Sequence, residues 1–231
     1  MTKTLIVAGF GPGISTAVAE RFGKAGFQLA LVARNADRLG AGVKSLEGKG
    51  MKAKAFPADL ADPAQARAVV GKVRDAMGPV DAIAWVAYSL AAGDALAADV
   101  TETAKSLGLS TTSLLATVQA ALPDLRERKG AVLVANGGLG LVDERTDAMI
   151  AQANLMGLSL ANAAKHKLVG MLAPKLRGDG VYVGEVMVFD VVKGTAFDQQ
   201  GIGTLDSSTV GEKFWDAYAA RSPTFHHVRQ A

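Results

Sequence analysis

A cluster of glycines near the N-terminus has the spacing of a phosphate-binding turn. The segment Leu5–Ser15 passes from an apolar run directly into a helical pattern, and Gly9, Gly11 and Gly13 lie at the junction. Glycines there allow a tight turn and bring backbone N–H groups close to a pyrophosphate, where the helix N-terminus favours negative charge. A purely structural turn is the alternative. The position of the cluster between a strand and a helix favours nucleotide binding.

The end of the second predicted strand carries a basic side chain, Arg34. Domains that bind NAD usually place Asp or Glu there, about twenty residues after the glycines, to bind the ribose 2′-hydroxyl. A guanidinium instead suits a 2′-phosphate, which it can bind through two hydrogen bonds. The sequence therefore predicts NADP(H) rather than NAD(H) as cofactor, although Arg34 could also be a solvated residue at the start of a helix.

The composition argues against several other kinds of chemistry. The 231 residues include no Cys, which excludes thiolate nucleophiles, cysteine zinc sites and iron–sulfur clusters. His226 and His227 are adjacent and would point to opposite faces of a strand, so we expect no metal. The formal net charge of +3 is too small to indicate nucleic acid binding. Because no apolar run has the length of a signal peptide core or a membrane helix, we expect a cytoplasmic protein without membrane contacts.

Short apolar runs alternate with helical patterns along the chain. Six runs read as buried strands: Thr4–Ala8, Leu29–Ala33, Ala53–Phe56, Ala82–Val86, Ala131–Ala135 and Val181–Val188. Strands that are separated by helices favour parallel, right-handed crossovers. We therefore predict an α/β fold, a Rossmann-type doubly wound parallel sheet of about six or seven strands with helices on both faces. The whole chain, residues 1–231, is expected to form a single domain.

Two long helical stretches, about Val100–Arg128 and Thr146–Leu176, flank the fifth strand. Pro174 should kink or tighten the second of them by Ala173. Near the C-terminus, the spacing of Thr209 and Glu212 predicts a capping box at the start of a short helix. Residues 193–221 follow the sixth strand at the edge where ligands bind, so this segment is a candidate substrate lid, or simply a loop.

The spacing Gly9-x-x-x-Gly13-x-Ser15 resembles the Gly-x-x-x-Gly-x-Gly signature of the short-chain dehydrogenase/reductase superfamily, with Ser at the third glycine. The resemblance extends along nearly the whole chain, through Asp59-Leu60, Gln119–Pro123, Gly130–Val134, Val181–Val188 and Thr195. By this resemblance, the residues expected to bind cofactor are Gly9, Gly11, Gly13, Ile14, Ser15, Arg34, Asp59, Leu60, Ala87 and Thr195.

The catalytic residues that the resemblance implies are all changed in this chain. The family uses a Tyr acid, a Lys four residues later, a Ser on the fifth strand and an Asn on the preceding helix, but no Tyr-x-x-x-Lys occurs here. The Tyr position falls on Leu158 and the Lys position on Asn162. Gly137 takes the Ser position, or Asn136 if the register slips by one, and Ser110 takes the Asn position. We expect Asn136, Gly137, Leu158 and Asn162 to line the substrate pocket.

Two side chains could replace the missing acid. Tyr88 ends the fourth strand beside the expected nicotinamide pocket, where it could donate a proton or simply form a wall of the cleft. Lys165 shares a helix face with Leu158 but lies two turns further along, where it could instead form a salt bridge or extend to solvent. His166 faces away from that stripe.

These features predict an NADP(H)-binding oxidoreductase with altered catalytic residues that transfers hydride to a small organic substrate. Substrates that need little protonation, such as a preformed iminium, fit the missing Tyr better than simple ketones. The alternative is a catalytically inactive dinucleotide-binding sensor or structural subunit. The long helices that flank the fifth strand resemble surfaces through which this family associates, so the resemblance implies a homodimer or homotetramer.

Overall fold

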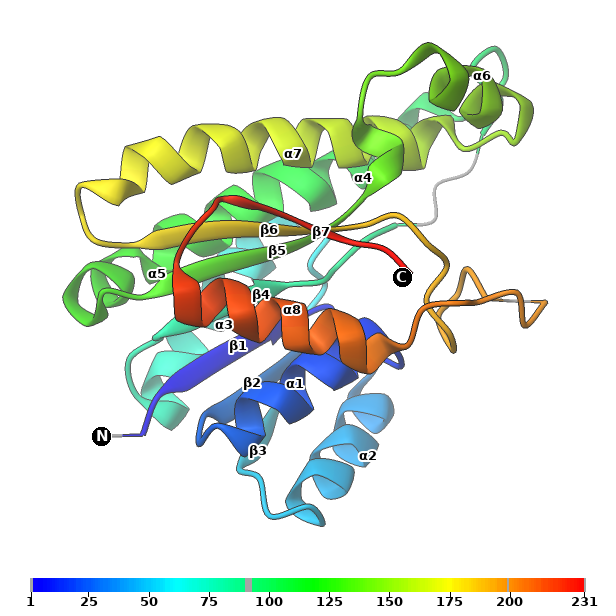
Figure 1. Ribbon diagram of the computed structural model, residues 1–231. Helices are drawn as coiled ribbons and strands as arrows, with labels where there is room; N and C mark the ends of the chain where they lie inside the picture. The colour runs from blue at the N-terminus through cyan, green and yellow to red at the C-terminus, as the bar shows by residue number, and fades with distance from the viewer. Residues whose placement is uncertain (1, 90–92, 199, 231) are drawn as a thin grey trace.

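A seven-stranded parallel sheet forms the centre of the protein (Figure 1). The computed structural model describes residues 2–89, 93–198 and 200–230. The strands are β1 (Thr4–Ala8), β2 (Gln28–Ala33), β3 (Ala53–Pro57), β4 (Ala82–Trp85), β5 (Ala131–Gly137), β6 (Tyr182–Val188) and β7 (Phe225–Val228). Their order is β3-β2-β1-β4-β5-β6-β7, and every neighbouring pair is parallel. This confirms the doubly wound Rossmann-type sheet, with the reversal of strand order between β1 and β4.

Helices cover both faces of the sheet. They are α1 (Ile14–Lys24), α2 (Ala36–Glu47), α3 (Pro63–Met77), α4 (Val100–Gly108), a π-helical turn η1 (Leu109–Ser113), α5 (Leu114–Arg128), a 3-10 turn η2 (Gly138–Gly140), α6 (Glu144–Gln152), α7 (Met156–Arg177) and α8 (Ser207–Ala220). Apolar side chains of α1, α2 and α8 pack on one face, and those of α3, α5 and α7 pack on the other. The strands alternate between the two layers: Leu5 and Val7 of β1 face the first, whereas Ile6 and Ala8 face the second.

Both long predicted helices differ in detail from expectation. The first forms as α4, η1 and α5 in succession. The second is divided, because Asn154 adopts a left-handed conformation with φ 54° between α6 and α7. Pro174 lies inside α7, and the helix continues beyond it to Arg177, one residue past the predicted end of the stretch at Leu176. Proline removes only the hydrogen bond of its own nitrogen, which the last turn of the helix tolerates here.

The predicted capping box near the C-terminus is also wrong. Helix α8 begins at Ser207, and its N-cap residue is Asp206. The backbone N–H of Thr209 donates to the carbonyl of Asp206, so Thr209 lies within the first turn, and Glu212 pairs with Arg21 of α1 instead. The helix thus starts three residues earlier than the sequence suggested.

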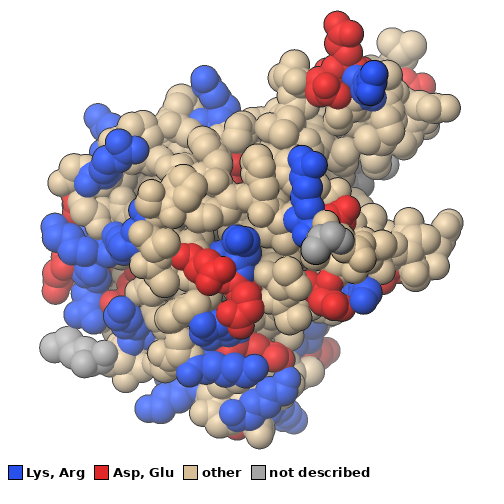
Figure 2. Space-filling model, in the orientation of Figure 1, with Lys and Arg blue, Asp and Glu red and all other residues tan. Residues whose placement is uncertain are grey.

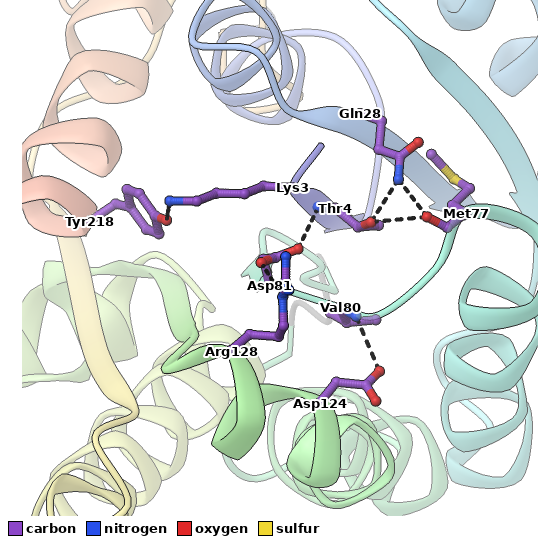
Figure 3. A network of polar contacts seen from close by, with 9 residues as sticks. All are labelled: Lys3, Thr4, Gln28, Met77, Val80, Asp81, Asp124, Arg128 and Tyr218. Atoms are coloured by element: carbon purple, nitrogen blue, oxygen red, sulfur yellow. Dashed lines mark hydrogen bonds and ion pairs between the residues drawn. The ribbon is translucent and has the colours of Figure 1, made fainter. Parts of the chain in front are cut away.

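A polar network joins elements at the amino edge of the sheet (Figure 3). The buried carboxylate of Asp81 accepts a hydrogen bond from the backbone of Thr4 at 2.8 Å and one from Arg128 at 3.0 Å. The carboxylate of Asp124 on α5 accepts from the backbone of Val80 at 3.1 Å. These contacts tie β1, the segment before β4 and α5 together at the edge opposite the glycine turn.

No helix in the described part of the chain is long and apolar enough to cross a membrane.

Candidate functional site

The glycine turn connects β1 to α1 at the reversal of strand order. Gly9 and Gly13 both have φ 87°, a conformation that glycine adopts without strain. A Cβ on Gly9 would lie 2.5 Å from the backbone of Ala87, just beyond β4, and a Cβ on Gly13 would lie 2.7 Å from Cγ2 of Thr195. The two glycines therefore allow Ala87 and Thr195, which the sequence also assigned to the cofactor site, to approach the turn. Gly11 has open space around it.

Ser15 maintains the shape of this turn from inside. Its hydroxyl accepts a hydrogen bond from the backbone N–H of Gly11 and donates one to the carbonyl of Gly11, both at 2.8 Å. The residue is buried, so a larger side chain would not fit. Ile14 begins α1 and packs partly buried against the core. Serine at the third glycine position thus acts on the turn itself.

The other predicted cofactor residues lie at the carboxyl ends of the neighbouring strands. Arg34 follows β2 and is exposed, and within the described part of the chain no hydrogen bond or ion pair engages its guanidinium. Asp59 follows β3 and accepts a hydrogen bond from the backbone of Ala61 at 3.0 Å. The side chain of Leu60 is buried in the core, so only its backbone faces the edge of the sheet. Arg34 is therefore available to bind an anion.

Two polar groups at the end of β5 already have partners. The amide nitrogen of Asn136 donates to the carbonyl of Asn162 at 3.0 Å and to the carboxylate of Glu185 at 2.7 Å. The amide oxygen of Asn136 accepts from the backbone N–H of Gly137 at 3.0 Å. Asn136 is buried and both of its amide groups are used. Gly137, the other residue that the resemblance places at the family's serine position, is partly exposed.

Glycines also bring β5 close to α7. A Cβ on Gly137 would lie 2.8 Å from the side-chain amide nitrogen of Asn162, and one on Gly140 would lie 2.6 Å from the backbone nitrogen of Ala163. The hydroxyl of Ser159 donates to the carbonyl of Leu139 in η2 at 2.8 Å. Leu158, which the resemblance assigns to the tyrosine position, is buried, as is Ser110 in the π-helical turn.

A buried carboxylate lies beside the contact between β5 and α7, and the sequence did not predict it. Glu185 is fully buried on β6, and its carboxylate contacts Asn136 and Nδ1 of His166, the latter at 2.6 Å. Lys165 is 2% exposed, which excludes an extension to solvent. Burial lowers the pKa of Lys165 to about 8, while the negative charge of Glu185 opposes this effect. The signal in the sequence was a single Glu inside the apolar run Val181–Val188.

Tyr88 and the first half of the predicted lid meet at the mouth of the site. The ring of Tyr88 stacks on Phe197 with centroids 5.6 Å apart, and burial raises the pKa of the Tyr88 hydroxyl. Residues 193–198 and 200–206 are loop, and Asp198 accepts hydrogen bonds from the backbones of Gly194 and Gly203. Residues 207–220 are instead helix α8, whose Phe214 is fully buried. Only the loop is therefore placed to act as a lid.

The mouth is open between two projecting parts of the surface. Figure 2 shows a notch between the lobe that carries α6 and the lobe that carries residues 193–198 and 200–206, on the side where the parallel strands end in Figure 1. In the described ranges, no group of three His, Asp or Glu side chains is arranged to hold a metal ion. The arrangement offers a glycine turn at the start of a helix, the exposed guanidinium of Arg34 and an open notch.

Comparison with known proteins identifies the class. A family model described as short chain dehydrogenase matches residues 3–154. The chain therefore belongs to the short-chain dehydrogenase/reductase superfamily, whose members are oxidoreductases. It is 35% identical over 91 residues to 2,3-dihydro-2,3-dihydroxybenzoate dehydrogenase of Bacillus subtilis, an aligned stretch that covers 39% of this chain but only 35% of that relative.

Solved structures share the fold over almost the full length. A short chain dehydrogenase from Burkholderia cenocepacia in complex with NADP superposes with a TM-score of 0.83 and 23% identity, covering 98% of this chain and 96% of the other. A blue fluorescent protein from a metagenomic library in complex with NADPH gives 0.83 and 22% identity, with the same shares. At these identities the likeness establishes the fold alone.

Proposed function

We propose that this protein is an NADP(H)-dependent oxidoreductase that transfers hydride to a small organic substrate. The main supporting observation is the exposed guanidinium of Arg34 at the end of β2, which has no partner among the described residues, beside a glycine turn that a Cβ would obstruct. Both observations fit a dinucleotide with a 2′-phosphate. Relatives in fold that were solved with NADP or NADPH support the same cofactor.

Different residues of the chain would bind different parts of the cofactor. The backbone of the glycine turn and the start of α1 would hold the pyrophosphate, and Arg34 the 2′-phosphate. Asp59 and Leu60 would lie at the adenine end, while Ala87 and Thr195 would contact the nicotinamide end. The bound cofactor supplies the hydride. The loop 193–206 would cover the site and exclude water from the reacting atoms.

The proton donor is either Lys165 or Tyr88. A pKa of about 8 suits Lys165 to proton transfer near neutral pH, but its side chain is almost fully buried. Tyr88 is 41% exposed at the mouth, but burial raises its pKa and makes it a weaker acid. Neither group matches the family's Tyr and Lys pair. A substrate that needs little protonation, such as a preformed iminium, is therefore the preferred substrate class.

Exposed apolar side chains near the site favour an apolar organic substrate. Large apolar side chains are exposed in the segments that follow β4, β5 and β6: Leu96, Val142, Met149, Phe197 and Ile202. Exposed apolar side chains that gather at a cleft commonly mark a ligand-binding groove.

A catalytically inactive dinucleotide-binding protein is the second candidate, because the four catalytic positions are changed and Asn136 has no free polar atom. Both candidates predict NADPH binding and differ in turnover. The test mixes the protein and saturating NADPH with a panel of carbonyl, imine and enone compounds and follows NADPH absorbance. Oxidation by at least one class, fastest with iminium compounds, supports the enzyme. Binding of NADPH without oxidation across the panel would refute it.

We also propose that the protein forms a homodimer or homotetramer. Leu160 and Met171 on α7 are 45% and 54% exposed, although α7 is a long helix beside the sheet. Burial of such side chains between subunits would remove apolar surface from water. A monomeric mass in solution by light scattering would contradict this proposal.

A further inference from the structure

The side-chain amide of Asn162 lies in the space that a serine at position 137 would require. Its nitrogen is 2.8 Å from the position of a Cβ on Gly137. A side chain at position 137 would require the Asn162 amide to move, so the amide can lie in its present place because residue 137 is glycine. Gly137 and Asn162 are therefore complementary replacements at two positions that lie 25 residues apart in the sequence.

Asn162 is almost fully buried, and its side-chain amide is available to a ligand. The residue is 5% exposed, and within the described ranges no hydrogen bond engages its side-chain amide, although its backbone carbonyl accepts from Asn136. Such a group beside a partly exposed glycine at the end of β5 is suited to a ligand atom that completes its hydrogen bonds.

Surrounding residues hold the backbone of Asn162 in a fixed position. Asn136 donates to the Asn162 carbonyl and is itself held by the carboxylate of Glu185. His166, in turn, contacts the other oxygen of Glu185. The close approach at Gly140 brings η2 against the backbone of α7 at the same point. A side-chain donor on a backbone that is fixed before the substrate binds needs less reorganisation during the reaction.

We propose that the amide N–H of Asn162 donates the hydrogen bond to the substrate's acceptor oxygen, or an equivalent acceptor atom, in place of the missing serine hydroxyl. This inference rests on the proposed hydride transfer. Hydride addition places negative charge on a carbonyl oxygen, and a hydrogen bond from the amide stabilises that charge without transferring a proton. The ligand class is a compound with a carbonyl or related acceptor group. An iminium has no such acceptor atom, so this hydrogen bond acts on the carbonyl and enone members of the panel, and kcat/KM is measured with them. Glu185 and Asn136 act as positioning residues for this donor.

Nuclear magnetic resonance tests the donor directly, because the chain has only four asparagines: Asn35, Asn136, Asn154 and Asn162. Protein labelled with 15N at asparagine and saturated with NADP+ is titrated with acetate, whose oxygens imitate the substrate oxygen. We expect the side-chain NH2 signal of Asn162 to move downfield and those of Asn35 and Asn154 to stay. Binding of NADP+ without a response of Asn162 would overturn this inference alone, whereas absence of NADP+ binding would overturn the proposed function.

Variants test the replacement of one donor by another. Asn162→Leu removes the donor at similar size and should lower kcat/KM about 10²–10³-fold with little change in the Kd of NADPH. Gly137→Ser alone should also lower kcat/KM, because its Cβ displaces the amide. Gly137→Ser combined with Asn162→Ala should recover part of the loss seen in Asn162→Ala. Unchanged kcat/KM in Asn162→Leu, or no recovery in the double variant, would overturn the inference. Asn154→Asp serves as control.

Discussion

Replacing Lys165 with methionine should change how stability depends on pH. The substitution removes an ammonium group that is 2% exposed between α7 and the sheet, but retains a flexible side chain of similar length. Lys167, two residues further along the same helix, is exposed. Lys167→Met is therefore a matched control that removes a positive charge from solvent.

The expected magnitude follows from the pKa of Lys165. In the unfolded chain this pKa is 10.5, and burial lowers it to about 8 in the folded protein. Below about pH 8 the lysine is charged in both states, so the folded state bears the full cost of the buried charge. Between about 8 and 10.5 the unfolded chain binds more protons, so the wild-type protein gains stability as pH rises. At about 1.4 kcal/mol for each tenfold difference, the full change approaches about 3 kcal/mol.

Urea unfolding of the three proteins at about pH 7 and about pH 10 measures this change. The free energy of unfolding of the wild type, relative to Lys165→Met, should rise by about 2–3 kcal/mol between the two pH values. The same difference relative to Lys167→Met should stay nearly constant. A difference for Lys165→Met that does not vary, or that falls with pH, would refute the assignment of Lys165 as a buried amine.

Three further substitutions test the packing around the site and the opposite edge of the sheet. Asp81→Ala leaves the Thr4 N–H without its acceptor and should lower the free energy of unfolding by about 2–3 kcal/mol; a loss below about 0.5 kcal/mol in urea unfolding would contradict this. Gly9→Ala places a Cβ 2.5 Å from the Ala87 backbone, so NADPH fluorescence titration should show no binding, whereas wild-type affinity would argue against the assigned turn. Gly140→Ala separates η2 from α7 and should lower the free energy of unfolding by about 1–3 kcal/mol, measured by thermal unfolding. An unchanged Tm would contradict this.

The sheet was largely predictable because parallel strands are buried on both faces and appear as apolar runs. β7 was missed as a segment since Phe225–Val228 contains two histidines and has one neighbour, β6. The division between α6 and α7 was missed because it depends on the left-handed conformation of Asn154, which apolar periodicity does not reveal.

The two halves of the site differ in how far the sequence could predict them. The glycine turn and Arg34 belong to continuous segments with a known spacing, so local sequence is sufficient to propose their chemistry. The pairing of Glu185 with His166, and the position of the Asn162 amide against Gly137, arise only when α7 packs on β5 and β6. Such contacts depend on the tertiary fold.

The central claim, a site that prefers NADP(H), is tested most directly by calorimetric titration of NADPH and NADH into the wild type and Arg34→Glu. The account predicts tighter binding of NADPH to the wild type, because Arg34 is free to bind the 2′-phosphate. Arg34→Glu should weaken NADPH binding at least tenfold, about 1.4 kcal/mol, and spare NADH binding. Tighter binding of NADH to the wild type, or no binding of either dinucleotide, would contradict the account.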